Sequence, residues 1–408
     1  MAFINKKIYP ALTYRDFRYF WCGQWISLIG TWMQYTAQQW LVYSLTKSAL
    51  LLGILGIAQF GPVMLFSLMA GVIIDRYPKR KVLLITQSVL LIQAILFAIL
   101  VWTDYLNYWF ILILATILGF ANTFDQPARQ SFIGELVGKQ DLRNAISLNS
   151  TIVNIARLVG PALAAIMLNQ YGAGLLFFMN GVSFIPVILG IYLIKGKTEA
   201  AVKYHEKISV ELLEGLRYIK NSPIILSTIS AMLIIGTFVM NLNVIAPLYV
   251  GEVINGGVNG YGAILSANGV GSLIGALLVA TLGKGNIGLK SIFGSGLIVS
   301  LLLALLSFIK DFHIALLLFA ILGFFNIMFI TNSNSIIQIN TEEKLRGRVM
   351  SVYNFAFLGT TPIGNLLAGV AMEKFDTEIG ILLCGIIALV LLIFVMLILG
   401  RNKPIKNT

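Results

Sequence analysis

Charged residues are scarce in this sequence. Asp, Glu, Lys and Arg make up only 11% of its 408 residues, whereas soluble domains carry roughly 25%. Hydrophobic residues make up 58%, and the mean hydropathy is +0.87. This composition excludes an ordinary soluble fold and indicates an integral membrane protein that has the lipid bilayer as its surroundings.

Residue types that carry chemistry are also few, with only two His and two Cys. Cys22 and Cys384 both fall within apolar runs, so we expect no disulfide. The sequence has no metal-ligand spacing, no nucleophile beside a base and no P-loop. We therefore predict a protein that has no metal site and no cofactor and is not an enzyme.

The apolar runs are continuous and lack the alternating pattern and short length of barrel strands. Each is long enough for a helix to cross the bilayer, which takes about 20 residues. The sequence therefore predicts an all-α integral membrane fold with twelve transmembrane helices. The predicted spans are residues 20–43, 50–74, 82–103, 108–124, 145–168, 175–194, 224–250, 261–282, 292–309, 314–337, 350–372 and 379–399.

The distribution of Lys and Arg predicts the orientation of these spans. With the N-terminus in the cytoplasm, the outer loops hold only Lys47, Lys310 and Lys374, and Arg157 lies within a span. The positive-inside rule then places both termini in the cytoplasm. The net charge of +12 is a topology signal, and because the cations are dispersed we expect no nucleic-acid binding.

The chain repeats itself at about half its length. Gly71 and Pro161 in the first half correspond to Gly275 and Pro362 in the second. We predict three parts: a six-helix bundle at residues 1–194, a cytoplasmic linker at 195–223 and a second six-helix bundle at 224–408.

The linker carries apolar residues at helical spacing. They predict an amphipathic helix along the inner membrane surface, and a solvated linker is the alternative. The residues on this face are Ile208, Leu212, Leu216 and Ile219.

The densest charge cluster of the first half lies between predicted spans 2 and 3, at residues 71–81. We expect Gly71 to let another helix approach closely. Asp75 ends a helix whose dipole disfavours a carboxylate there, so we expect it to have a partner from outside that helix.

Several stretches carry a resemblance to a known family. Gly71-x-x-x-Asp75-Arg76-x-Pro78-Lys79-Arg80 resembles the signature of the major facilitator superfamily, and Ala156-x-x-x-Gly160-Pro161 resembles the span 5 motif of its antiporters. Residues 23–34, 126–130 and 345–351 resemble the branch that contains the enterobactin exporter and macrolide efflux proteins. The resemblance covers the whole chain.

This resemblance implies a major facilitator fold, in which two pseudo-symmetric bundles enclose a substrate cavity near the midplane and alternate its access. It implies that Gly160 and Pro161 form a helix-packing motif. It also implies a cytoplasmic latch, in which Asp125 pairs with cations of the loop after span 2 and Asp75 faces the start of span 11. The latch residues are Gly71, Asp75, Arg76, Lys79, Arg80, Asp125, Arg129 and Arg346.

If such a cavity exists, polar residues should recur at helical spacing on the spans that line it. Helix packing is the alternative explanation, because amide and small residues also join transmembrane helices. The candidate cavity residues are Gln24, Ser27, Thr31, Gln34, Tyr35, Gln38, Asn122, Asn154, Arg157, Asn241, Asn326 and Asn334.

Arg157 is the one cation deep inside a predicted span. It lies about 18 Å into span 5, at about 1.5 Å per residue, where an unpaired charge costs at least about 2.5 to 3.5 kcal/mol. Arg157 is therefore expected to contact an anionic substrate or a gate, or else to bond amides such as Asn154 or backbone carbonyls.

Asp125 is the acid nearest the expected cavity and our candidate for proton coupling. The plain alternative is an i, i+4 ion pair with Arg129. Facilitated diffusion, another ion and a proton carried by the substrate are the alternatives to coupling through this residue.

The sequence thus predicts a monomeric secondary transporter in the inner or plasma membrane of a prokaryote. It would export a small amphipathic molecule such as a drug or siderophore, and protons are the candidate counter-ion. The alternatives are an importer or flippase of a lipid or nutrient, and a facilitated-diffusion carrier.

Overall fold

The computed structural model describes residues 9–138, 140–194, 208–282, 288–342 and 345–399. Every regular element within these ranges is helical, as the continuous apolar runs predict. The chain divides into two compact units. Unit 1 comprises Met1–Leu45 and Gly61–Lys203, and unit 2 comprises Thr46–Phe60 and Tyr204–Thr408.

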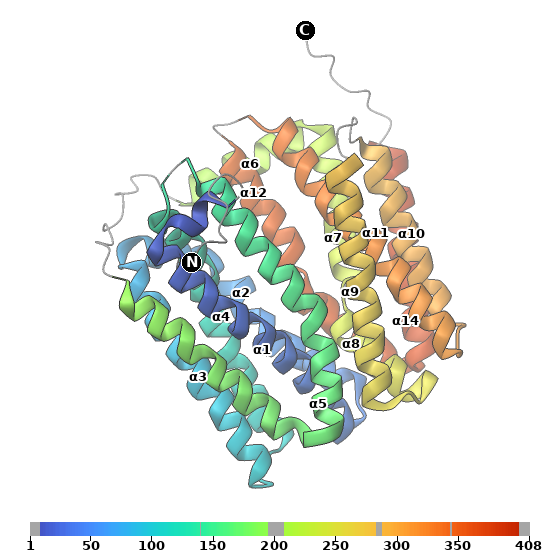
Figure 1. The fold of residues 1–408 in the computed structure, drawn as a ribbon. Coiled ribbons are helices and arrows are strands. Elements are labelled where there is room, and N and C mark those ends of the chain that lie inside the picture. The colour runs from blue at the N-terminus through green and yellow to red at the C-terminus, as the bar shows by residue number, and fades with distance from the viewer. Residues whose placement is uncertain (1–8, 139, 195–207, 283–287, 343–344, 400–408) are drawn as a thin grey trace. The chain divides into compact units, whose positions relative to one another are not determined.

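Five long helices carry the first half of the chain (Figure 1). A 3-10 turn, Pro10–Thr13, precedes them. Gly172, at φ +75°, interrupts the helical backbone of the last one, at the connection predicted between spans 5 and 6. The helices are α1 (Arg15–Thr46), α2 (Ala49–Arg76), α3 (Lys79–Trp102), α4 (Tyr108–Leu136) and α5 (Leu142–Leu193).

The remaining helices belong to unit 2. The predicted seventh span is broken, because α7 ends at Phe238 and α8 begins at Leu242. The elements are α6 (Ile208–Asn221), α7 (Pro223–Phe238), α8 (Leu242–Leu248), a π-helical segment (Tyr249–Ile254), α9 (Gly257–Leu282), α10 (Leu289–Leu306), α11 (Phe312–Asn340), α12 (Arg346–Asn354), a second π-helical segment (Phe355–Gly359), α13 (Thr361–Phe375) and α14 (Thr377–Leu399).

Within the described residues, ten helical segments are long and apolar enough to cross a membrane. One of them is α5, which contains two of the predicted spans on either side of Gly172. Another predicted span lies in α1, which has 32 residues but is not among the ten, because its Gln residues lower its hydropathy. The multi-pass helical fold is confirmed, and the count of twelve spans stays a prediction.

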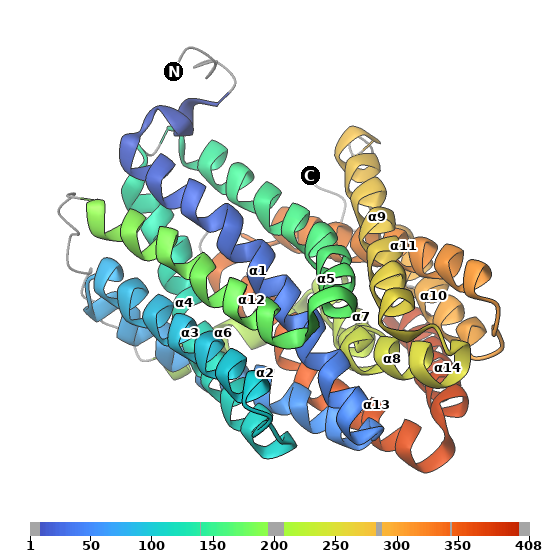
Figure 2. The ribbon, with the colours of Figure 1, turned by 60° about the horizontal axis from the view of Figure 1, so that its bottom comes forward.

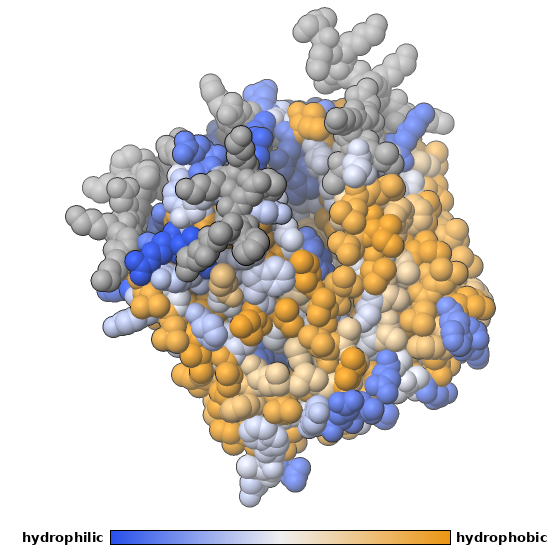
Figure 3. All heavy atoms as spheres, viewed as in Figure 1, coloured by the Kyte–Doolittle hydropathy of each residue, from blue (hydrophilic) through white to orange (hydrophobic). Residues whose placement is uncertain are grey.

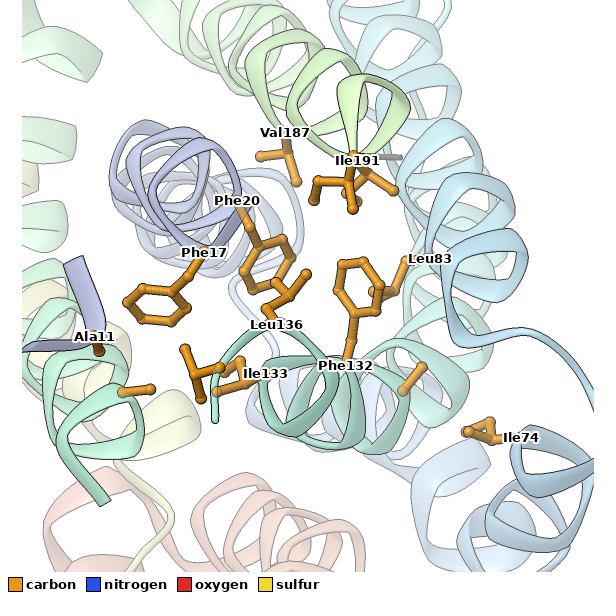
Figure 4. Packing of buried hydrophobic residues seen from close by; sticks show 14 of the residues in the cluster. Ala11, Phe17, Phe20, Ile74, Leu83, Phe132, Ile133, Leu136, Val187 and Ile191 are labelled. Atoms are coloured by element: carbon orange, nitrogen blue, oxygen red, sulfur yellow. The ribbon is translucent and has the colours of Figure 1, made fainter. Parts of the chain in front are cut away.

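The core of unit 1 joins all five of its helices. Phe20 of α1 meets Phe132 of α4 edge-to-face, with ring centroids 5.5 Å apart. Leu83 of α3 and Ile191 of α5 complete the same cluster (Figure 4). In Figures 1 and 2, α3 lies beside the second half of α5. This packing holds the polar side chains of the unit at fixed positions.

Small residues set the packing of unit 2. A Cβ atom at Gly271 of α9 would collide with the backbone of Ala320 in α11, so these two helices make backbone contact, as GxxxG-type pairs do. Asn268 Nδ2 donates a hydrogen bond to the Phe319 carbonyl across the same contact, at 3.2 Å.

Apolar side chains cover the outward face of α9, which is yellow in Figure 1 and orange in the space-filling view of Figure 3. Ile274 and Leu277 of α9 are 54% and 58% exposed. On α3, Ile85, Ile92 and Ile99 are exposed at steps of seven residues. Such stripes suit contact with acyl chains.

Candidate functional site

A buried carboxylate, Asp125 of α4, is the centre of a polar network in unit 1. It is fully buried and forms an ion pair with Arg129, one turn further along the helix. Its Oδ1 accepts hydrogen bonds from Thr86 Oγ1 at 2.8 Å and from Gln87 Nε2 at 2.7 Å. Arg129 also donates to Gln24 Oε1 of α1. The i, i+4 pair expected from the sequence therefore forms, within a network that ties α1, α3 and α4 together.

Two cations that follow α2, Lys79 and Arg80, have other partners than Asp125. Lys79 lies 3.7 Å from Glu135, near the end of α4. Arg80 donates hydrogen bonds to the backbone carbonyls of Ile191 and Tyr192, at 3.1 and 2.7 Å. The pairing of Asp125 with this loop is thus not what the structure shows. The reason is the position of Asp125 along α4. It precedes Glu135 by ten residues, about 15 Å along the helix, so Glu135 is the acid within reach of the loop.

The remaining latch residues are placed as follows. A Cβ atom at Gly71 would meet no heavy atom of the described residues within 4 Å, so the close helix approach expected there is not seen among these residues and stays a prediction. Arg76 and Arg346 are exposed. The side chain of Asp75 lies outside the described part of the structure, and the latch as a whole stays a prediction.

A second buried network surrounds Gln34 of α1. Gln34 Nε2 donates to Gln93 Oε1 of α3 at 3.1 Å, and Asn180 Nδ2 of α5 donates to Gln34 Oε1 at 2.8 Å. Gln93 in turn donates to the Leu114 carbonyl of α4. All three amides are buried, so this placement of Gln34 favours the helix-packing interpretation.

The sequence analysis missed the partners in both networks, which are Thr86, Gln87, Gln93 and Asn180. The available signal was the presence of amide side chains inside apolar runs, since polar residues within a span need partners.

Arg157 of α5 has an aromatic neighbour. Its guanidinium carbon lies 5.1 Å from the centroid of the Trp32 ring of α1, and the Trp32 and Tyr35 rings are 5.9 Å apart. Asn122 Nδ2 donates to the Tyr35 hydroxyl at 3.0 Å. Asn154, the amide proposed as a partner of Arg157, donates instead to the Ser150 carbonyl at 2.9 Å.

The Gly160-Pro161 pair lies one turn beyond Arg157 and is buried against α1. A Cβ atom at Gly160 would come within 2.5 Å of Trp32 Cβ. The absence of that atom lets α1 and α5 approach and brings Trp32 next to Arg157.

The other candidate cavity residues are distributed over both units. Ser27, Gln38 and Asn241 are buried, whereas Thr31, Asn326 and Asn334 are half-buried. Thr31 donates to the Ser27 carbonyl at 2.8 Å, and Asn241 to the Thr237 carbonyl at 2.6 Å. Asn334 accepts from Gln338.

The helical fold, with ten candidate membrane-crossing segments among the described residues and with buried polar networks, is that of a multi-pass membrane protein. The family model MFS_3, described as "Transmembrane secretion effector", matches residues 8–405. The chain therefore belongs to this family, and its resemblance to the efflux branch of the major facilitator superfamily is confirmed.

Three relatives are similar over most of their length. The Staphyloferrin A transporter of Staphylococcus aureus is 26% identical over 371 residues, which cover 88% of this chain and 90% of that protein. The multidrug efflux pump Tap of Mycolicibacterium fortuitum is 25% identical over 83% of this chain and 85% of that protein. Macrolide efflux protein A of Streptococcus pyogenes is 21% identical and covers 90% and 91%.

Solved structures agree with the fold. A crystal structure of a mutant of the nucleoside transporter NupG matches with a TM-score of 0.75 at 13% identity, over 95% of this chain and 99% of that one. A bacterial homologue of the lysosomal transporter Spinster, inward-facing and unoccupied, matches with a TM-score of 0.74 at 13% identity, over 97% and 99%.

Proposed function

We propose that the protein is a secondary transporter that exports a small amphipathic compound from the cell by alternating access. The observation that carries this proposal is the family match over residues 8–405. The names of the relatives, which include a multidrug and a macrolide efflux protein, supply the direction. The activity is transport, with no catalytic step assigned to any residue.

The test is transport by the purified protein in liposomes. Candidate substrates are staphyloferrin A, a macrolide and the amphipathic dye ethidium, each measured with and without an imposed pH gradient. Export predicts movement of at least one of them in the direction set by the protein's orientation. Movement of none of them, or uptake of a lipid or nutrient instead, would contradict the proposal.

Proton coupling is proposed to run through Asp125. The proposal rests on its full burial and on its contacts with Arg129, Thr86 and Gln87, since a buried acid within a membrane span is typical of a proton relay. Asp125→Asn should leave substrate movement down its own gradient but abolish the response to the pH gradient. Flux that ignores the gradient in the unmodified protein would rule out proton antiport.

The latch around Asp75 is proposed to favour the outward-facing state. Asp75→Asn should then raise the population open to the cytoplasm. A Cys introduced at Asn154, an exposed residue of α5, should be alkylated faster in inside-out vesicles. The matched control is Asp104→Asn, in the exposed turn after α3. Equal alkylation rates and equal transport rates in the two variants would contradict the latch proposal.

A further inference from the structure

The first half of α5 exposes a row of polar side chains. Apart from the adjacent Ser150 and Thr151, they follow one another at three or four residues, which keeps them on one side of the helix, and the buried Ile152 and Ala156 lie on the other side. Of the described residues along this row, Ile146 is the one large apolar residue that is exposed, whereas beyond Arg157 the exposed residues become apolar, with Leu163 and Ile166. The row consists of Arg143, Ser147, Ser150, Thr151, Asn154 and Arg157.

This row cannot face acyl chains. From Arg143 to Arg157 it runs about 21 Å along the helix at 1.5 Å per residue, which is well over half of a hydrocarbon core about 30 Å thick. The break at Gly172 lies about 22 Å beyond Arg157, so Arg157 is near the middle of its span. An exposed cation at that depth is strongly disfavoured in lipid, and the row therefore lines a water-filled path that ends at Arg157.

Arg157 differs from Arg129, the cation of the buried network around Asp125. The charge of Arg129 is balanced by Asp125, whereas no carboxylate of the described residues lies within ion-pair distance of Arg157. A guanidinium that stacks on an aromatic face keeps its N–H groups, which point outward in its plane. Those of Arg157 have no hydrogen-bond acceptor within the described ranges, and the side chain is exposed.

We propose that Arg157 and Trp32 form the binding site for a carboxylate that is attached to a planar apolar body. The carboxylate accepts two hydrogen bonds from the guanidinium edge, and the apolar body packs against the Trp32 and Tyr35 rings. The inference deepens the proposed function, on which it rests, by making the substrate an amphipathic anion. Gly160 is a positioning residue, because it allows Trp32 to reach Arg157.

The test uses three probes that share one aromatic body: 1-naphthoate, the neutral 1-naphthamide and the cationic 1-naphthylmethylammonium. Their binding to the full-length protein in phosphatidylcholine nanodiscs is measured by equilibrium dialysis. Naphthoate should bind at least about tenfold more tightly than naphthamide, the range of one charge-assisted hydrogen-bond pair. The ammonium probe should bind most weakly. Equal binding of the anionic and neutral probes would overturn the inference without any variant.

Variants separate a binding role from a structural one. Arg157→Gln should abolish the preference for naphthoate while naphthamide affinity stays within about threefold, and Arg157→Lys should give an intermediate preference. Arg143→Gln, at the far end of the polar row, should leave the preference unchanged. If Arg157→Gln weakens both probes equally, Arg157 only joins α1 to α5 and the inference is wrong.

Transport distinguishes this inference from the function on which it rests. Export of ethidium by a protein that binds naphthoate and naphthamide equally would support the proposed function but overturn the anion site. Binding of naphthoate with the expected dependence on Arg157, with no transport of any compound, would keep the site and overturn the proposed export.

Discussion

At the scale of single residues, the two buried networks differ in how far the sequence could predict them. The Asp125–Arg129 pair follows from spacing along one helix. The contacts of Gln34 join positions 59 and 146 residues away in sequence. A helical pattern states which face a residue lies on but not which helix covers it, so only the local pair could be predicted.

The buried ion pair leads to a prediction about stability. Asp125→Asn leaves the largely buried Arg129 charge without its counter-charge, a change that typically costs about 3 to 5 kcal/mol in a buried pair. The midpoint of thermal unfolding, measured by size-exclusion after heating, should therefore fall. Combining Asp125→Asn with Arg129→Gln removes the unpaired charge and should restore part of the lost stability. A double variant as unstable as the sum of the two single ones would show that the pair is not coupled.

At the scale of helices, sequence patterns predicted where a helix occurs better than whether it is continuous. The connection between predicted spans 5 and 6 coincides with Gly172. The seventh span was predicted as one helix, yet it breaks between Phe238 and Leu242, because hydropathy does not register a local change of backbone direction. The linker segment contains the helix α6, where Ile219 is buried but Leu216 is 44% exposed. The side chains of Ile208 and Leu212 lie outside the described residues.

The contact between α1 and α5 gives a prediction at this scale. Gly160→Ala places a methyl group within 2.5 Å of Trp32 Cβ, and such overpacking typically costs about 1 to 3 kcal/mol. Thermal unfolding should therefore occur at a lower temperature. The matched control is Gly294→Ala in α10, where a Cβ meets nothing within 4 Å. There Ala should be neutral or stabilising by up to about 1 kcal/mol. An equal fall of the unfolding temperature in both variants would contradict close packing at Gly160.

At the scale of the whole molecule, composition and motifs predicted the fold class and the family, both of which are now shown. They could not predict how the chain groups into units, because that depends on contacts between helices. Thr46–Phe60, the first part of α2, belongs to unit 2. Glu373 of α13 accepts hydrogen bonds there from Ser48 Oγ at 2.9 Å and from the Leu50 backbone N–H at 3.1 Å. Nothing in the residue pattern of the first half signals this partner.

Orientation in the membrane is a prediction that two tyrosines can test. Tyr77 and Tyr105 are both exposed, 58% and 75%, and lie just beyond opposite ends of α3. A helix of 24 residues is about 36 Å long, which is enough to place these two positions on opposite membrane faces. The distribution of Lys and Arg puts Tyr77 on the cytoplasmic side and Tyr105 outside.

Single cysteines at these positions, in a background with Cys22→Ser and Cys384→Ser, report the orientation directly. In intact cells, a membrane-impermeant maleimide should label Tyr105→Cys and leave Tyr77→Cys unlabelled. After lysis both should react, which controls for accessibility. The reverse pattern would place both predicted cytoplasmic termini outside the cell, and labelling of both in intact cells would mean that α3 does not cross the membrane. The expected pattern follows because loops rich in Lys and Arg stay on the cytoplasmic side of the membrane. Residues 76–81, beside Tyr77, carry four such cations.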